Sequence, residues 1–127
     1  MLSGVISFDS GGWGNYSDVT RTISSNKAKQ TTNKGRTWTT ITGTKPASSA
    51  LLTAGASEKT NKMNIYDFAG NEFELTLEKT SDSNYPCAVR GGDYLTTGSN
   101  YPASSRDNVS TTVAHDGVGF RPTLYVS

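Results

Sequence analysis

The residues best suited to recognition chemistry lie in one polar stretch, Asp93 to Asp116. It combines tyrosines with short polar side chains, an arginine, several acids and the single histidine of the chain. Tyrosine offers contact area at a low entropic cost, and Ser and Asn offer adaptable hydrogen bonds, as in antibody binding loops. The stretch is therefore a candidate ligand-binding surface, unless its tyrosines belong to the core. The candidate binding residues are Asp93, Tyr94, Ser99, Asn100, Tyr101, Arg106, Asp107, Asn108, His115 and Asp116.

Catalytic constellations are weak in this chain. A hydrolytic triad would have to combine His115 and Asp116 with a serine. No Gly-x-Ser-x-Gly elbow is present, and adjacent residues rarely orient one another as base and acid do. The single cysteine, Cys87, has the apolar neighbours Pro86 and Ala88 and is expected to be a small buried hydrophobe. We therefore expect no enzyme activity from these residues.

Three predicted strands surround the polar stretch. Residues 72–78 alternate Phe73, Leu75 and Leu77 with polar residues, which predicts a half-buried strand. Residues 87–91 predict the next strand and residues 118–126 the last, with Pro122 marking an edge or a bulge. Residues 93–117 between them lack a regular pattern, which predicts a functional or mobile loop.

The first half of the chain is less regular. Residues 1–8 alternate weakly, which favours a short strand, and residues 36–42 are β-branched and aromatic, which favours another. Residues 19–35 are polar without a period and are expected to form a long loop. Residues 44–62 are small and polar, and they hold at most one helical turn.

Composition narrows the possible classes of protein. The chain has 127 residues, a length that fits a single domain spanning residues 1–127. Its net charge of +1, without a run of like charges, argues against a nucleic-acid-binding surface. One cysteine excludes an internal disulfide. No apolar run approaches the roughly 18 residues of a membrane span, and the N-terminus does not read as a signal peptide.

Three motifs occur in a fixed order along the second half. They are NIYDFAGNEFELT at residues 64–76, RGGD at residues 90–93 and GFRP at residues 119–122. In this order they resemble the formylglycine-generating-enzyme-like (sulfatase-modifying factor) branch of the C-type lectin fold. The resemblance implies an α+β, C-type-lectin-like fold that is β-rich, with short helices and long irregular loops. Full-length members carry a further N-terminal part, so the chain resembles the C-terminal portion of that fold.

The resemblance also sets a test for the family's chemistry. The enzymes bind copper through two nearby cysteines after the RGG strand, and related iron-dependent sulfoxide synthases use three histidines. Here Cys87 precedes Arg90, residues 93–117 contain no cysteine, and His115 is the single histidine. A thiolate copper site needs soft ligands in pairs. These departures predict a non-catalytic member, similar to the variable ligand-binding proteins of diversity-generating retroelements in phage and bacteria.

A calcium site of the family can be carried over by position. Its ligands would be the carboxylates of Asp67 and Glu74 and the carbonyls of Gly70 and Glu72, which are hard oxygen ligands of the kind calcium prefers. The alternative is that both carboxylates only accept backbone N–H groups within the turn. Calcium is therefore a possible cofactor and no other is expected.

Two arginines lie beside Gly or Pro inside apolar strands. Arg90 and Arg121 are expected to brace carbonyls, or a carboxylate such as Asp67 or Glu74, because a guanidinium offers several donors in a fixed geometry. A direct ligand contact is the alternative for both.

The sequence predicts a non-catalytic ligand-binding or display domain with its binding surface between the RGG and GFRP motifs. Expected partners are a protein or a glycan on a cell surface, with neither nucleic-acid binding nor membrane insertion. The resemblance implies a place on a phage particle or a bacterial cell surface. Two alternatives stay open: a structural phage tail or particle subunit that makes protein–protein contacts, and a degenerate formylglycine-generating-type oxidase fragment. The ligand and the oligomeric state do not follow from the sequence.

Overall fold

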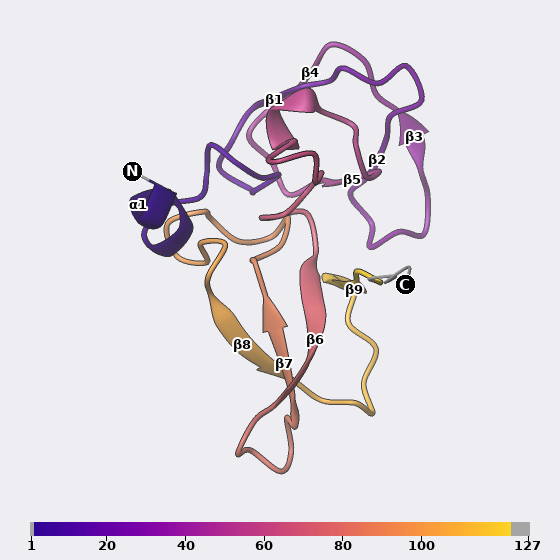
Figure 1. The fold of residues 1–127 in the computed structure, drawn as a ribbon. Helices are drawn as coiled ribbons and strands as arrows, with labels where there is room; N and C mark the ends of the chain where they lie inside the picture. Colours follow the sequence, from indigo (N-terminus) through magenta and orange to yellow (C-terminus); the bar gives the residue numbers. More distant parts are fainter. Residues whose placement is uncertain (1, 123–127) are drawn as a thin grey trace, which may run out of the picture.

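A computed structural model describes residues 2–122 of the chain. Figure 1 shows strands β1 to β5 gathered in one part of the molecule and β6 to β9 in the other, with helix α1 at the side. The elements are α1 (Leu2–Ser7), β1 (Arg21–Thr22), β2 (Lys29–Thr31), β3 (Thr39–Thr40), β4 (Thr44–Lys45), β5 (Leu51–Leu52), the 3-10 helix η1 (Glu58–Thr60), β6 (Phe73–Lys79), β7 (Cys87–Arg90), β8 (Arg106–Val109) and β9 (Val118–Phe120). The described part is thus β-rich with long irregular connections, as expected for a chain rich in Ser, Thr, Asn and Gly.

The largest sheet has four strands in the order β8-β7-β6-β9. Strand β7 runs antiparallel to both β6 and β8, whereas β9 runs parallel to β6 with Val118 opposite Phe73. Successive side chains of a strand point to opposite faces. Phe73, Leu75 and Val118 therefore belong to one side, which we call the apolar face. Glu74 and Arg90, which are directly opposite each other, belong to the other side, which we call the charged face.

The two-stranded sheet of β1 and β4 is tied to the glycine-rich loop by two buried cations. Arg21 of β1 lies opposite Lys45 of β4, and both side chains are buried. Arg21 Nε donates to the Gly14 carbonyl at 2.7 Å, and Lys45 Nζ donates to the carbonyls of Tyr16 and Val19, each at 3.1 Å. A buried charge is tolerated only when such partners replace water. The two cations therefore fix the loop of residues 11–19 onto the β1–β4 pair.

Tyr16 joins this loop to the second half of the chain. It is fully buried, and its hydroxyl lies 2.8 Å from the Tyr101 carbonyl and 3.0 Å from the Gly91 carbonyl. Nearby, the backbone of Gly14 passes so close to Ala69 that an added Cβ would lie 1.9 Å from the Ala69 carbonyl oxygen. The turn that follows residue 64 is therefore packed directly against the glycine-rich loop.

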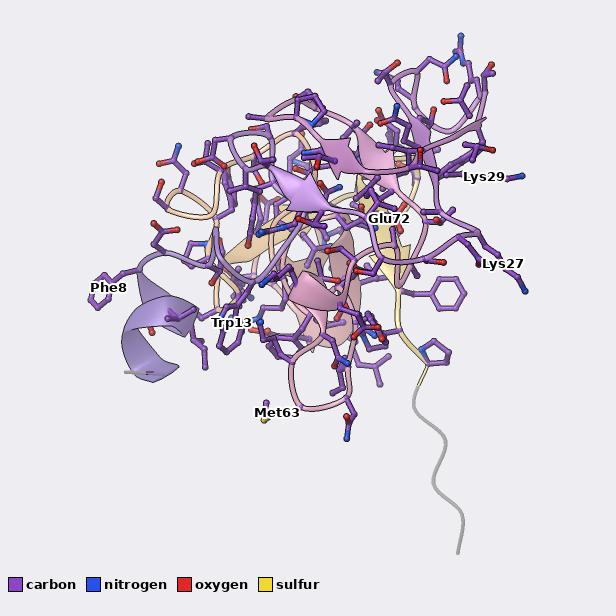
Figure 2. All side chains as sticks on the ribbon, turned by 90° about the horizontal axis from the view of Figure 1, so that it is seen from above. Phe8, Trp13, Lys27, Lys29, Met63 and Glu72 are labelled. Carbon is purple, nitrogen blue, oxygen red and sulfur yellow. The ribbon has the colours of Figure 1, made fainter. Side chains whose placement is uncertain are left out.

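The N-terminal strand expected for residues 1–8 is wrong over the described residues, because residues 2–7 form helix α1. Ile6 packs against the cluster that contains Tyr16 and Ala103, and this contact favours the helix. Figure 2 shows Trp13 beside α1, while Phe8 and Met63 project away from the body. Among residues 2–122, α1 and every other helix are too short or too polar to cross a bilayer.

Other expectations for the first half are confirmed only in part. Of residues 36–42 only Thr39 and Thr40 form a strand, and Trp38 keeps 38% of its surface exposed. The loop expected at residues 19–35 contains the short strands β1 and β2. The single helical turn allowed within residues 44–62 is present as η1, capped by the Ser57 hydroxyl, which accepts the Lys59 N–H.

In the second half, strands β6 and β7 lie where they were expected. The half-buried character of β6 holds only for Phe73, however, since Leu75 is 45% exposed and Leu77 is fully exposed. A period of two fixes which side chains share a face and does not say what covers that face. The uninterrupted loop expected at residues 93–117 is wrong, because β8 lies within it and pairs with β7. The last expected strand begins at Val118, and residues 123–126 lie outside the described residues.

Candidate functional site

The predicted binding residues differ in exposure. Asp93 and Tyr94 are buried, with 6% and 2% of their surface exposed. Tyr101, Asn108 and Asp116 are half-buried. The exposed members are Ser99, Asn100, Arg106, Asp107 and His115.

Half of these residues meet in one hollow on the apolar face. The hollow has a volume of about 230 Å³, and the predicted residues that line it are Asp93, Asp107, Asn108, His115 and Asp116. Its floor is apolar and consists of Phe73, Val89, Val109 and Val118, which belong to all four strands of the sheet. We call this feature the acid-rimmed hollow.

Asp93 is the most enclosed carboxylate of the hollow. Its Oδ1 accepts the Leu95 N–H at 3.1 Å. Burial raises the pKa of its carboxyl group, and the charge of Asp116 raises it further. An added Cβ on Gly117 would lie 2.3 Å from Asp93 Oδ2, so the chain passes against this carboxylate without a side chain. Asp93 is therefore held in place at the edge of β9.

Asp116 contributes the second enclosed oxygen of the rim. Its Oδ2 is buried and accepts no hydrogen bond. The ion-pair partner of this atom is Lys34 Nζ at 3.5 Å, and the Lys34 side chain is 67% exposed. A solvated lysine at that distance neutralises a carboxylate only weakly. The rim thus keeps negative charge close to an apolar floor.

The two tyrosines among the predicted residues do not line the hollow. Burial raises the pKa of Tyr94, and the acids Asp116, Asp93 and Glu72 add to the effect in that order. The ring of Tyr101 packs edge-on against Phe73, with 5.5 Å between the ring centroids. Tyr94 therefore belongs to the interior and not to an exposed binding surface, which is the alternative that the sequence left open for the tyrosines.

Arg106 lies on the opposite side of the sheet. Its Nε donates to Glu78 Oε1 at 2.6 Å, and Arg90 Nη2 donates to Oε2 of the same carboxylate at 2.9 Å. Arg90 Nη1 also donates to the Ser104 carbonyl at 2.9 Å. The bracing role predicted for Arg90 is confirmed. Arg106, Ser99 and Asn100 do not line the acid-rimmed hollow.

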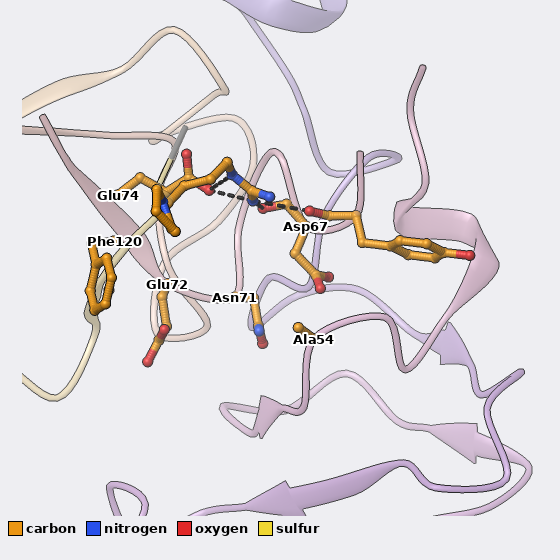
Figure 3. Close-up of a pocket in the computed structure, with 10 residues that line it drawn as sticks. Ala54, Asp67, Asn71, Glu72, Glu74 and Phe120 are labelled. Carbon is orange, nitrogen blue, oxygen red and sulfur yellow. Dashed lines mark hydrogen bonds and ion pairs between the residues drawn. The ribbon is translucent and has the colours of Figure 1, made fainter. Parts of the chain in front are cut away.

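The side chain of Arg121 donates hydrogen bonds to the turn predicted to hold calcium. Figure 3 shows the predicted ligands Asp67, Glu72 and Glu74 of this turn. Arg121 Nε donates to Glu74 Oε1 at 2.6 Å, and Nη2 donates to the carbonyls of Tyr66 and Asp67 at 3.0 and 3.2 Å. Asp67 Oδ2 accepts the Gly55 N–H at 2.9 Å. The bracing role predicted for Arg121 is confirmed. The alternative to calcium holds only in part, because Asp67 accepts a backbone N–H from Gly55 outside the turn, whereas Glu74 accepts from the Arg121 side chain.

Of the two carbonyls predicted as calcium ligands, that of Gly70 is engaged within the chain, and the carboxylate of Glu72 packs against Gly119. The Gly70 carbonyl accepts the Glu72 N–H at 2.8 Å. An added Cβ on Gly119 would lie 2.4 Å from Glu72 Oε2. Burial raises the pKa of both Asp67 and Glu72. Within residues 2–122, no three side chains of His, Cys, Asp or Glu are grouped as metal ligands. The four residues therefore do not fit a calcium ion in this arrangement.

The sequence model of the Sulfatase-modifying factor enzyme 1-like domain family matches residues 11–124. The chain belongs to this family. No curated protein and no solved structure matches it. The membership predicted from the three motifs is confirmed, while the C-type-lectin-like fold stays a prediction.

This member of the sulfatase-modifying factor family has its one cysteine beside the hollow. Cys87 lies at the start of β7, is half-buried, and lines a second hollow of about 260 Å³. That hollow shares Val109, His115 and Val118 with the acid-rimmed hollow, so the two are neighbours on the apolar face.

The sequence did not indicate the floor residues or Lys34 as parts of the site. The floor residues come from four strands whose alignment only the fold reveals. Lys34 lies far from the polar stretch in the sequence, and it reaches Asp116 only in the folded chain.

Proposed function

We propose that the protein is a non-catalytic ligand-binding domain of the sulfatase-modifying factor family, with the acid-rimmed hollow as its binding site. The observation that carries this proposal is the convergence of Asp93, Asp107, His115 and Asp116 on one hollow, which Asn108 borders although its side chain lies beside Arg106 on the charged face. An apolar floor with a few polar groups at the rim is typical of ligand sites. A buried acid with a raised pKa, such as Asp93, is a further feature that clusters at functional sites.

The elements around the hollow combine a fixed frame with an open edge. Asp107 projects from β8, and His115 and Asp116 directly precede β9, so the rim rests on paired strands. Residues 111–115 form an exposed run between those strands. A site built on rigid elements holds its geometry, and a loop at its edge can adapt to different partners. This arrangement suits the recognition of a protein or a glycan on a cell surface, from a phage particle or a bacterial surface.

The absence of catalysis is part of the proposal. The family's copper chemistry needs two thiolates, and its iron chemistry needs three imidazoles, whereas this chain has one cysteine and one histidine. Copper analysis and an oxygen-consumption assay with a thiol peptide should therefore show neither bound copper nor turnover. Turnover above the buffer rate would instead support the degenerate oxidase fragment.

The binding proposal is tested with fluorescently labelled protein on a glycan array and on a panel of intact bacteria. We expect saturable binding to at least one of these targets. The double variant Asp107→Asn, His115→Ala should lose that binding, since both side chains lie on the rim. The matched control Asp18→Asn, an exposed acid outside the hollow, should bind like the parent. Equal binding by all three proteins would refute the site.

A second candidate function is supported by exposed apolar side chains near the same sheet. Leu75 and Phe120 are directly opposite each other on β6 and β9 and are 45% and 79% exposed, and Leu77 is fully exposed. Large apolar groups gathered on a surface often mark a protein–protein contact. A particle subunit would bury them in an assembly. Light scattering over a hundredfold range of protein concentration distinguishes the two functions. A particle subunit should form oligomers that the Leu77→Lys variant does not form. A protein that stays monomeric would favour the ligand-binding domain.

A further inference from the structure

The charged face of the sheet carries a hollow that the proposed function does not use. It has a volume of about 380 Å³, and its walls include Phe68, Glu74, Thr76, Arg90 and Arg121. Glu74 and Arg90 are opposite each other in the β6–β7 pair and belong to the charged face, whereas the acid-rimmed hollow lies on the apolar face. The two hollows have no lining residue in common and are therefore separate, and we call this one the arginine hollow.

Both arginines of the hollow are already fixed in position. Arg90 donates to the Ser104 carbonyl and to Glu78, and Arg121 donates to Glu74 and to the carbonyls of Tyr66 and Asp67. These bonds use Nη1 and Nη2 of Arg90 and Nε and Nη2 of Arg121. Among residues 2–122, no acceptor is found for the remaining nitrogens, Arg90 Nε and Arg121 Nη1. Side chains that are ordered before binding lose little entropy when a ligand arrives. Each arginine thus keeps a donor for a ligand at a low entropic cost.

The side chains that line the hollow carry one more positive charge than negative charge. The carboxylate of Glu78 is shared by Arg90 and Arg106, and Arg121 pairs with Glu74. Of the side chains that line the hollow itself, two are guanidiniums, Arg90 and Arg121, and one is a carboxylate, Glu74. Arginine recognises a carboxylate through parallel N–H bonds of fixed geometry. A ligand with one carboxylate matches the surplus.

The other residues that line the hollow favour two further features in the ligand. Phe68 is 36% exposed and offers an aromatic ring, which suits an apolar ring face. Glu74 offers carboxylate oxygens, which accept hydrogen bonds and so favour a ligand with hydroxyl donors. A molecule that combines one carboxylate, several hydroxyls and a ring with an apolar face is a sugar acid. We propose that the arginine hollow binds a uronic acid, either free or at the end of an acidic glycan.

The proposal is tested by titrating isotope-labelled protein with glucuronate and following the backbone amide resonances by NMR. Glucose has the same ring without the carboxylate, and benzoate has the carboxylate without the hydroxyls. We expect glucuronate to shift the amides of Thr76 and Gly91, and we expect either control compound to bind at least about tenfold more weakly. A glucuronate-terminated oligosaccharide that binds about tenfold more tightly than free glucuronate would indicate a glycan as the source, and equal affinity would indicate the free sugar acid.

Two substitutions make the test specific. Arg90→Gln removes a charge from the wall and should weaken glucuronate binding by about tenfold. Arg106→Gln removes the same charge from the same face and the same Glu78 cluster, but Arg106 does not line the hollow, so the affinity should stay within about twofold. Equal losses in both variants would show that only general surface charge matters, and the proposal would fail. Glucose binding as tight as glucuronate binding in the parent protein would also overturn it, without any variant.

Discussion

Arg121 donates from Nε to Oε1 of Glu74 at 2.6 Å and so joins the residue after β9 to β6. The same guanidinium reaches the carbonyls of Tyr66 and Asp67, so one side chain gathers the groups that a calcium ion would have gathered. A fixed cation of the protein thus replaces a bound cation in this turn. The GFRP motif reads here as a brace for the turn of residues 64–76.

Calcium should therefore have no effect on this protein. Because the Arg121 guanidinium already pairs with Glu74, a second cation would meet electrostatic repulsion and lack free ligands. Calorimetric titration of chelator-treated protein with millimolar calcium should give no heat of binding, and the melting temperature should stay constant. Saturable heat that disappears in Glu74→Gln would contradict this expectation and restore the calcium site.

The main sheet was largely predictable, and its surroundings were not. The alternation of residues 72–78 and the apolar run at residues 87–91 indicated β6 and β7 correctly. Strand β8 was missed because Arg106, Asp107 and Asn108 are polar and carry no alternation. Its pairing with β7, which orders it, depends on contacts between distant residues that no local pattern records.

The sequence predicted the segment that contains the candidate site but not how its side chains are arranged. Residue types typical of binding surfaces pointed to residues 93–116, and half of the chosen residues share one hollow. The burial of Asp93 and Tyr94 could not be foreseen, because Asp is seldom buried and a tyrosine suits both core and surface. The side chains of Arg106 and Asp107 point to opposite faces of the sheet because both belong to β8, a strand that was not predicted from the sequence.

Tyr94 and Tyr101 should act on stability. Tyr94→Ala removes a buried ring and leaves a cavity, so the free energy of unfolding should fall by about 3 kcal/mol or more. Tyr101→Ala should cost somewhat less, because its ring is half-buried against Phe73. Urea unfolding monitored by circular dichroism measures both losses. Asn100→Ala, at an exposed neighbouring position, should change stability by no more than about 0.5 kcal/mol. Unchanged stability in Tyr94→Ala would mean that its side chain is not in the core.

Gly14 should not tolerate a side chain. A Cβ at this position would lie 1.9 Å from the Ala69 carbonyl oxygen, so Gly14→Ala forces the glycine-rich loop away from the turn. We expect a loss of about 2 kcal/mol or more in the free energy of unfolding. Gly12→Ala is the matched control, because no atom lies within 4 Å of the added Cβ. Chemical denaturation of the two variants compares them directly, and similar stabilities would disprove the close contact.

Lys45 should make stability depend on alkaline pH. Burial and, to a smaller extent, the charge of Arg21 lower its pKa from the ordinary value of 10.5 to about 8. Between those two values the unfolded chain binds a proton that the folded chain has released, so stability rises with pH in this window. Below about pH 8 both states are protonated, and the cost of the buried charge is present in full.

The readout is the difference between the parent protein and Lys45→Met at several pH values. From pH 8 to pH 9.5 the parent should gain on the order of 1 to 2 kcal/mol relative to the variant. The comparison removes the contributions of other titrating groups, and the loss of the Lys45 hydrogen bonds shifts all points by a similar amount. A difference that stays constant from pH 7 to pH 10 would show that Lys45 is not desolvated.

The proposed function depends above all on ligand binding in the acid-rimmed hollow. The most direct measurement is an NMR screen of a library of small fragments against isotope-labelled protein with assigned amide resonances. We predict that a major group of bound fragments shifts the amides of Asp107, Asn108, His115 and Gly117 together. The double variant Asp107→Asn, His115→Ala should abolish those shifts. Fragments that bind elsewhere while these amides stay unperturbed, or shifts that persist in the double variant, would contradict the central claim.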